Sequence, residues 1–386
     1  MLHLVVPGWA RPRQMIGKEA TELKLYGTTG EPCLFKHVSP RDIQQGYLGD
    51  CWLVSSFSAL AEYPDRVRSL FKQKSLSADG RYDIRLYCPH EEEWKVITID
   101  DRLPYWQRPG QYGNLCFAKQ STENEFWPCL LEKAVAKLVG AYYRIDGGFE
   151  SIALEMLTGK PAINIGISEA GTHQPYGILT GPDEKQVTHA SVYLRKTGFD
   201  AHWGYWGQDA SKFCNNKTDL SDADLWSTLK SWDKEGYSIA CGSRGNYQAT
   251  TVSVVNEGII AGHAYTMLRT VEVQVLRQGK SLKFQMLHVR NPHMTNEWKG
   301  KWYDDDRETW NKYPEVMKAC DHKVGVKDNG VFWMEWADFK KGFAELAVCF
   351  DNQQEGPRYT DQSEQAQEDH AHVSFGRTGH QRWEGL

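Results

Sequence analysis

One cysteine in this chain stands where a nucleophile could be activated. The segment 45–52 (QGYLGDCW) places Cys51 after a glycine-containing turn and at the expected start of a helix. The positive end of a helix dipole stabilises a thiolate, and the unpaired amides there can bind an oxyanion. Gln45 lies six residues earlier, where a turn would bring its amide beside Cys51 as a second donor. The competing interpretation is a small buried hydrophobe, the common fate of a free cysteine.

A base for this cysteine has to come from the 13 histidines. His263 stands out because it follows Gly262 at the start of an apolar strand, in the segment 259–265 (IIAGHAY). Asn291 follows the expected strand 282–290 and precedes Pro292. If two antiparallel strand ends bring them together, the asparagine would fix the imidazole tautomer and the imidazolium would pair with the thiolate. The alternatives are a core histidine and a turn asparagine, since Asn-Pro commonly starts turns.

Hydrophobic periodicity predicts the elements that would carry these residues. Helices are expected over 51–63, where Pro64 should end the helix, and over 125–139. Strands are expected over 81–88, 94–99, 271–275, 282–290, 331–336 and 344–350, with a turn at 278–280. Gly46, Gly49 and Asp50 suit a tight turn and an N-cap before the first helix. The pattern is an α+β chain with a helix-rich first half and a strand-rich second half.

Composition restricts the class of protein. The 386 residues carry a formal net charge of −5 without a long basic block, which gives nucleic-acid binding no electrostatic support. The nine cysteines are scattered, odd in number and never spaced as C-x-x-C, which favours free thiols in a reducing compartment. No basic signal-peptide region and no apolar stretch of about 18 residues is present. A soluble cytoplasmic protein with no transmembrane segment is expected.

Several motifs, in the same order along the chain, resemble the calpain family of cysteine proteases. The segment 45–52 looks like the active-site motif of that family. Further matching segments are 9–12 (WARP), 100–104 (DDRLP), 125–127 (EFW), 131–134 (LEKA), 262–265 (GHAY), 291–292 (NP), 297–298 (EW) and 332–334 (FWM). Together they cover roughly residues 9–350, and so many motifs in one order make chance similarity an inadequate explanation.

The resemblance implies a papain-like fold with the active-site cleft between two subdomains. Residues 1–159 would supply Cys51 and Gln45, and residues 160–350 would supply His263 and Asn291, with an insertion at about 165–235. The polar tail 351–386 is expected to be disordered. The implied activity is intracellular endoproteolysis, usually limited cleavage of protein substrates.

Two other functions compete with this one. A catalytically silent homologue could bind partners through the same fold, but it has no chemical reason to retain all four of Cys51, His263, Asn291 and Gln45. Acyl transfer to amines by a Cys-His-Asp enzyme is the other alternative. The asparagine at position 291 and the Gln-Gly turn fit a protease better.

The resemblance also implies calcium as a cofactor. The first site would use the side chains of Asp42 and Glu125, completed by backbone oxygens near Phe35 and His37. A second site would use Glu297 and Asp304. Hard carboxylate oxygens are the ligands that calcium prefers, although without the resemblance the preferred interpretation of each acid is a solvated surface charge.

The chain departs from the family pattern at three informative positions. His293 stands where the family usually has tryptophan, and Asn329 and Val331 stand where acids are expected near the second calcium site. Fewer anionic ligands mean weaker binding, so the first site is expected to bind calcium better than the second. The loss of a bulky side chain at position 293 further favours some activity without calcium.

Overall fold

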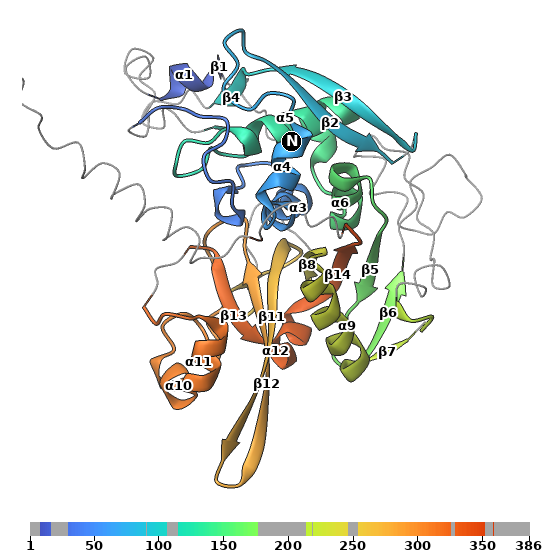
Figure 1. The fold of residues 1–386 in the computed structure, drawn as a ribbon, viewed down its shortest axis with the longest axis vertical. Coiled ribbons are helices and arrows are strands. Elements are labelled where there is room, and N and C mark those ends of the chain that lie inside the picture. Colours follow the sequence, from blue (N-terminus) through green and yellow to red (C-terminus); the bar gives the residue numbers. More distant parts are fainter. Residues whose placement is uncertain are drawn as a thin grey trace, which may run out of the picture.

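The computed structural model describes residues 8–16, 30–89, 91–105, 115–176, 214–217, 219–245, 254–325, 329–351 and 358. These residues form a mixed helix-and-sheet protein of the expected α+β class. Helices and a two-stranded hairpin dominate the first half of the chain, and one large sheet dominates the second (Figure 1).

The first half contains short strands and the helices that surround one core. Its elements are β1 (Gly8–Ala10), α1 (Pro12–Met15), η1 (Pro40–Asp42), α3 (Cys51–Ala61), α4 (Pro64–Leu70), β2 (Arg81–Cys88), β3 (Glu93–Asp100), β4 (Leu103–Tyr105), α5 (Trp127–Val139), η2 (Tyr142–Ile145) and α6 (Glu150–Thr158). Strand β1 pairs with β4, and β2 pairs with β3. The apolar face of α5 is buried, and Gly140 ends the helix with φ of 108°, a left-handed conformation that glycine adopts without strain.

The second half contributes an eight-stranded sheet in the order β13-β12-β11-β8-β14-β5-β6-β7. Its elements are β5 (Ala162–Gly166), β6 (Thr172–Tyr176), β7 (Leu220–Ser221), α9 (Asp222–Glu235), β8 (Ser238–Ser243), β9 (Val254–Asn256), β10 (Ile259–Ile260), β11 (Ala264–Arg277), β12 (Lys280–Arg290), α10 (Arg307–Lys312), α11 (Pro314–Cys320), β13 (Val331–Glu335), α12 (Trp336–Gly342) and β14 (Phe343–Cys349). Strands β9 and β10 pair separately. Neighbouring strands of the large sheet run antiparallel.

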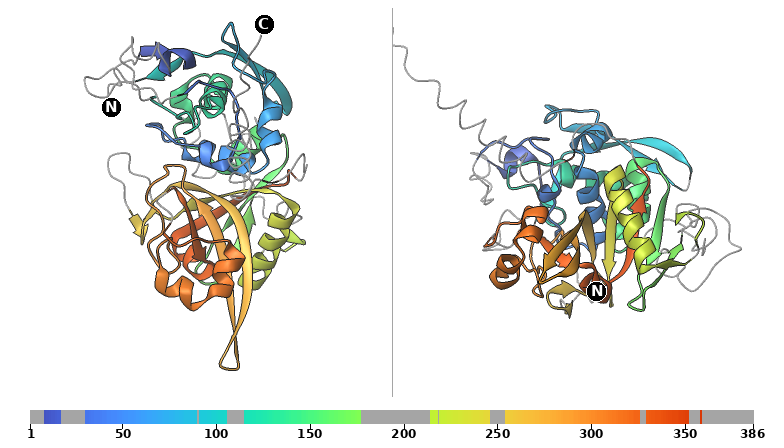
Figure 2. Two further views of the ribbon diagram at one scale, coloured as in Figure 1. Left: turned by 60° about the vertical axis from the view of Figure 1, so that its left-hand side comes forward. Right: turned by 60° about the horizontal axis from the view of Figure 1, so that its bottom comes forward.

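Two large apolar clusters correspond to the two halves. One draws its buried side chains from positions between Ala10 and Leu157, and the other from positions between Ile163 and Val348. Helix α3 lies where the halves meet, beside β8 and β11 (Figures 1 and 2). The buried Thr266 hydroxyl on β11 donates to the Ser55 carbonyl on α3 at 2.7 Å. The helix that begins at Cys51 is therefore fixed directly to the strand that begins just after His263.

Three expectations need correction or qualification. Pro64 begins helix α4 rather than simply ending the preceding helix, because proline at the first turn has no N–H to satisfy and its φ suits a helix. Asp50 is the residue before α3, but its side chain makes no cap hydrogen bond. Most of the stretch predicted as an insertion at 165–235 lies outside the described residues over 177–213, and so does the tail 351–386 apart from Asp351 and Arg358.

The cysteines and the lengths of the helices bear on the expected class of protein. All nine cysteines are free thiols. Within the described ranges, no helix combines the length and the apolar character needed to cross a bilayer.

Candidate active site

Cys51 is the first residue of α3, and Trp52 fixes that end of the helix. The Trp52 indole donates to the Ile145 carbonyl at 2.9 Å, and the amides of Leu53 and Val54 both donate to the Asp50 carbonyl. Of the nine cysteines, only Cys51 and Cys33 keep intermediate solvent exposure, whereas the other seven are buried. The cysteine singled out by the sequence is thus one of the two that keep partial exposure as whole residues.

His263 is held by a backbone turn between β10 and β11. Gly262 has a φ of 57°, which lets the chain turn before the histidine. The amide of His263 donates to the Ser243 hydroxyl at 2.9 Å, and its carbonyl accepts from the Ser243 amide at the same distance. His263 as a whole residue is 1% exposed. Its position is consequently determined by β8 and by the turn rather than by solvent.

Asn291 follows the end of β12, and its carboxamide has a partner on each polar atom. The Oδ1 atom accepts from His263 Nε2 at 2.9 Å and from the His293 amide at 3.0 Å. The Nδ2 atom donates to the carbonyls of Thr295 at 2.6 Å and Asn296 at 3.2 Å. Because Oδ1 only accepts, Nε2 is the protonated nitrogen of neutral His263. The lone pair of the ring then lies on Nδ1, which is buried and has no hydrogen-bond partner among the described residues.

Backbone contacts bring the cysteine turn and the histidine turn together. The amide of Ala264, the residue after His263, is close enough to the Cys51 sulfur to lower the pKa of its thiol. The backbone N–H of Gln45 donates to the Pro292 carbonyl at 3.0 Å. This bond joins the turn before Cys51 to the residue after Asn291. Cys51, His263 and Asn291 therefore share one site, although 240 positions of the sequence separate the first from the last.

The surroundings of the sulfur favour a neutral thiol in the resting protein. Burial raises the pKa of the Cys51 thiol to about 12, and the negative charges of Glu150 and Asp50 add to the rise, while the amides of Ala264 and Trp52 oppose it. Burial, together with the neighbouring His293, lowers the pKa of His263 to about 3, and the bond to Asn291 opposes that shift. The expected stabilisation of a thiolate by the helix start is present, but burial outweighs it. Charge separation requires the proton to pass between the two groups.

The side chain of Gln45 lies against the same turn. Its Nε2 atom donates to the Leu48 carbonyl at 2.8 Å, and its Oε1 atom is buried with no hydrogen-bond partner among the described residues. One amide hydrogen is thus used to brace the turn that precedes Cys51. Gln45 lies in the expected turn, while its donation toward a substrate stays a prediction.

Two further residues of the site make contacts that the sequence did not predict. Ser243 holds both backbone groups of His263, and its hydroxyl also contacts the Ile260 carbonyl at 2.5 Å. The sequence predicted only the loss of a bulky side chain at position 293, and with it some activity without calcium, yet the His293 ring lies 4.5 Å from that of His263. Its position two residues after Asn291 was the available signal, because a residue so close to the end of β12 stays near the same histidine.

The first pair of predicted calcium ligands lies together in the interior. Asp42 accepts from the Ser39 amide at 2.7 Å and the Trp127 indole at 3.2 Å, and Glu125 accepts from the Val38 amide at 3.3 Å. Burial and the negative charge of Glu125 raise the pKa of Asp42. Two buried carboxylates that repel one another fit a divalent cation in charge and donor type.

The second pair is arranged differently. Glu297 accepts from the amides of Asn329, at 2.6 Å, and Gly330. The backbone carbonyl of Asp304 accepts from His322 Nε2 at 2.9 Å. Across the described part of the chain, no group of three histidine, cysteine, aspartate or glutamate side chains is clustered to hold a metal ion. Asp42 and Glu125 therefore fit a calcium site because both acids are buried and act on one another. Glu297 and Asp304 fit one only because they are acidic residues.

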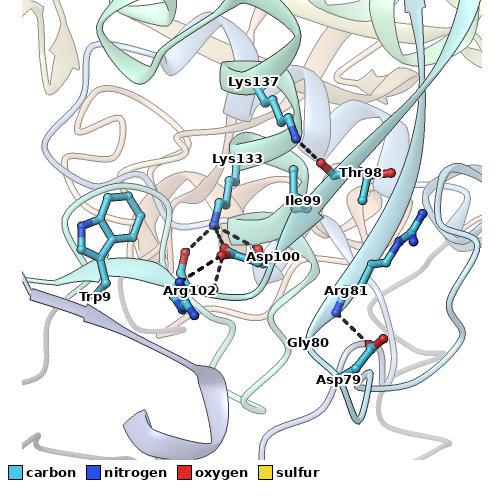
Figure 3. A pocket seen from close by; sticks show the side chains of 10 residues that line it. All are labelled: Trp9, Asp79, Gly80, Arg81, Thr98, Ile99, Asp100, Arg102, Lys133 and Lys137. Atoms are coloured by element: carbon cyan, nitrogen blue, oxygen red, sulfur yellow. Dashed lines mark hydrogen bonds and ion pairs between the residues drawn. The ribbon is translucent and has the colours of Figure 1, made fainter.

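A cavity of about 720 Å³ lies elsewhere, between β1, β3 and α5 (Figure 3). Lys133 and Lys137 lie along its wall with Trp9, as the labelled side chains show. Their amino groups are used internally, since Lys133 donates to the backbone carbonyls of Asp100 and Arg102, and Lys137 to that of Thr98. None of the four residues proposed from the sequence for catalysis lines this cavity.

Comparison with known proteins agrees with the motif order. The family model described as calpain family cysteine protease matches residues 5–350. The chain is 30% identical over 347 residues to Calpain-type cysteine protease ADL1 of Oryza sativa subsp. japonica, covering 89% of this chain and 13% of the relative. It is 30% identical over 342 residues to Calpain-9 of Rattus norvegicus, covering 88% of this chain and 39% of the relative. This sequence thus spans well under two thirds of these relatives, and it belongs to the calpain family of cysteine proteases.

Proposed function

We propose that this chain is a cysteine endopeptidase that uses Cys51 as nucleophile, His263 as general base and Asn291 as the residue that orients the base. The observation that carries the proposal is the bond of 2.9 Å between His263 Nε2 and Asn291 Oδ1. It leaves Nδ1 as a buried acceptor without a hydrogen-bond partner among the described residues, while the Ala264 amide lowers the pKa of the Cys51 thiol. Nucleophilic catalysis by cysteine requires a neutral imidazole with a free acceptor nitrogen near the thiol, and the Ala264 amide places the histidine turn near the Cys51 sulfur.

The chemistry follows from this placement. Cys51 transfers its proton to Nδ1 of His263, and the thiolate attacks the carbonyl carbon of the scissile peptide. The Cys51 amide and Gln45 are proposed to bind the oxyanion that develops. The imidazolium then protonates the leaving amine, and a water molecule, deprotonated by His263, releases the acyl group from the sulfur. Asn291 keeps the ring in one tautomer throughout, because its Oδ1 can only accept a hydrogen bond.

The proposed fold is papain-like, with residues 1–159 and 160–350 as two subdomains and the cleft between them. The two apolar clusters support this division, since one ends at Leu157 and the other begins at Ile163. The substrates would be proteins, cleaved at a limited number of positions. The nine free thiols are consistent with a cytoplasmic enzyme.

The nucleophile is tested by substitution and by chemical labelling. Cys51→Ala should abolish casein digestion, a loss on the order of a million-fold for a nucleophile of such a triad. An epoxysuccinyl peptide inhibitor should modify Cys51 selectively, as mapped by mass spectrometry. Cys33→Ala is the matched control, because Cys33 is the other cysteine with intermediate exposure and burial raises the pKa of its thiol to about 11. Full activity of Cys51→Ala, or faster labelling of Cys33, would reject the assignment.

We further propose that calcium modulates the enzyme, with the first site stronger than the second. Asp42 and Glu125 would hold the ion there, and its positive charge would relieve the repulsion between these buried carboxylates. Glu297 and Asp304 would hold the second ion with less anionic support, since Asn329 and Val331 are uncharged. The family resemblance and the proximity of Asp42 to Glu125 support the first site.

A titration of peptidase activity with calcium tests both the activity without calcium and the ranking of the two sites. Some activity should persist in chelator, and Glu125→Gln should weaken the calcium response more than Glu297→Gln. Direct calorimetric titration of calcium into Cys51→Ala protein provides a readout independent of turnover. Negligible activity in chelator with steep activation at micromolar calcium would contradict the proposed partial independence. A response abolished only by Glu297→Gln would contradict the ranking of the two sites.

A further inference from the structure

A second imidazole touches the proposed catalytic base. The rings of His293 and His263 lie 4.5 Å apart between centroids, at an interplanar angle of 81°. The position of His293 is fixed by its own backbone, whose amide donates to Asn291 Oδ1 at 3.0 Å. The two histidines therefore share Asn291 Oδ1 as an acceptor, one through its ring and the other through its main chain.

At this separation the two rings cannot both carry a proton without mutual repulsion. Two unit charges about 4–5 Å apart in a protein interior interact strongly enough to shift a pKa by roughly two units. The other charged group shown to act on His293 is Lys119, from the segment before α5. His263 also contacts Tyr265, whose ring lies 5.0 Å away, and the Ala264 amide beside it lowers the pKa of the Cys51 thiol.

The surroundings keep His293 neutral near neutral pH. Burial and, to a smaller degree, the positive charge of Lys119 lower the pKa of His293 below its ordinary value. Lys119 is held in place because its backbone amide donates to the Gln44 carbonyl at 2.9 Å. A neutral His293 leaves His263 able to accept a proton, whereas a protonated His293 opposes it.

Protonation of His293 should lower activity, because it opposes the proton transfer from Cys51 to His263. When the S–H bond of Cys51 breaks, the proton forms an N–H bond at Nδ1 of His263 and leaves a thiolate and an imidazolium. A positive charge on His293 raises the free energy of that imidazolium, so the proton returns to sulfur. Activity should be present above the pKa of His293 and be lost as the pH falls through it.

We propose that His293 is a positioning residue that makes the Cys51–His263 proton transfer sensitive to acidification. Its contact with the base means that protonation of His293 suppresses formation of the thiolate–imidazolium pair. The proposal rests on the catalytic assignment of Cys51 and His263 and adds to it a residue that acts through the base.

The test compares the pH dependence of wild type, His293→Phe and His293→Gln. The measurements are kcat/KM on a peptide substrate and the rate at which iodoacetamide alkylates Cys51. Removing the second titratable ring should move the acidic limb of both profiles down by about one to two pH units. Alkylation below the wild-type limb should rise about tenfold or more, while the plateau near neutral pH should change less than about threefold. His288→Phe is the matched control, because His288 stacks on Trp333 at 4.4 Å and makes no described contact with His263.

The outcomes separate this inference from the proposed function. Loss of turnover in Cys51→Ala together with an unmoved acidic limb in both His293 variants would overturn the role of His293 alone. A limb that moved equally in His288→Phe would also overturn it. Full turnover in Cys51→Ala would instead reject the nucleophile. If neither His293 variant folds, an NMR titration of the histidines in Cys51→Ala protein decides. Coupled titration of the two rings supports the proposal, and a His293 that stays neutral throughout the acidic limb overturns it.

Discussion

The carboxamide of Asn291 illustrates how single residues organise this site. Its Oδ1 atom accepts two hydrogen bonds and its Nδ2 atom donates two, so neither rotation nor a flip of the amide is tolerated without losing a partner. That rigidity is passed to His263, whose Nδ1 atom is left as the acceptor. The proposed base is therefore oriented by main-chain atoms at 293, 295 and 296 as much as by Asn291 itself.

Gln45 gives a prediction at the scale of one residue. Gln45→Ala should keep the fold and lower kcat by roughly a hundred- to a thousand-fold, the usual size for one oxyanion donor. Steady-state kinetics on a peptide substrate measure this, with circular dichroism to verify folding. Gln44→Ala is the control. The described contact of Gln44 is made by its backbone carbonyl, which accepts from the Lys119 amide, whereas the side-chain amide of Gln45 donates to the turn before Cys51. A larger loss in Gln44→Ala than in Gln45→Ala, with both folded, would contradict the role of Gln45.

At the scale of elements, Arg290 docks the end of β12 against α3. It is fully buried, and its guanidinium donates to the Ser58 hydroxyl at 2.9 Å and to the carbonyl of Ile43. Because Arg290 directly precedes Asn291, these contacts also fix where the carboxamide lies relative to the helix of Cys51. The planar guanidinium suits such a position, since it reaches several acceptors at once.

Arg290→Met should destabilise the protein by about 2–4 kcal/mol, because it leaves buried acceptors unsatisfied while roughly conserving volume. It should also lower kcat more than it raises KM, since Asn291 loses its support. Urea denaturation and steady-state kinetics provide the two measurements. Arg81→Met is the matched control: the Arg81 side chain is 61% exposed and pairs with Asp83, so a change of less than about 1 kcal/mol is expected. Equal stability losses in the two variants would show that Arg290 has no special docking role.

At the scale of the whole molecule, Arg358 connects the two halves. Its guanidinium donates to Glu62 at the end of α3, to Asp233 on α9, and to the carbonyl of Leu268 on β11. Burial raises the pKa of Glu62 to about 7, and the positive charge of Arg358 opposes that rise. A residue late in the chain thus compensates two largely buried acids at the boundary between the halves.

Arg358→Ala should destabilise the protein by about 2–4 kcal/mol, because it leaves buried acids without their cation. The folded-state pKa of Glu62 lies above its ordinary value, so the stability that Glu62 contributes is full at acidic pH and declines as the pH rises through about 7. Loss of Arg358 should consequently lower the free energy of unfolding more at about pH 8 than at about pH 5.5. Urea denaturation at both pH values measures this difference.

Arg307→Ala is the appropriate control for this experiment. The Arg307 side chain is 69% exposed and pairs with Asp305, so its loss should change the free energy of unfolding by less than about 1 kcal/mol at either pH. Arg358→Lys retains the charge without the planar fork and should fall between wild type and Arg358→Ala. A pH-independent loss in Arg358→Ala would contradict the coupling to Glu62.

The sequence by itself determined the features that depend on near neighbours along the chain. Helical spacing located the helices that begin at Cys51 and Trp127, and the Gln278-Gly279 turn located the hairpin of β11 and β12, because these patterns arise from local backbone geometry. The order of the motifs was sufficient to identify the calpain family. Only the tertiary structure decided what depends on distant contacts. No local pattern reports burial, and burial raises the pKa of the Cys51 thiol to about 12. The turn at Gly262 lies against the end of β12, and this packing brings the His293 ring into contact with that of His263.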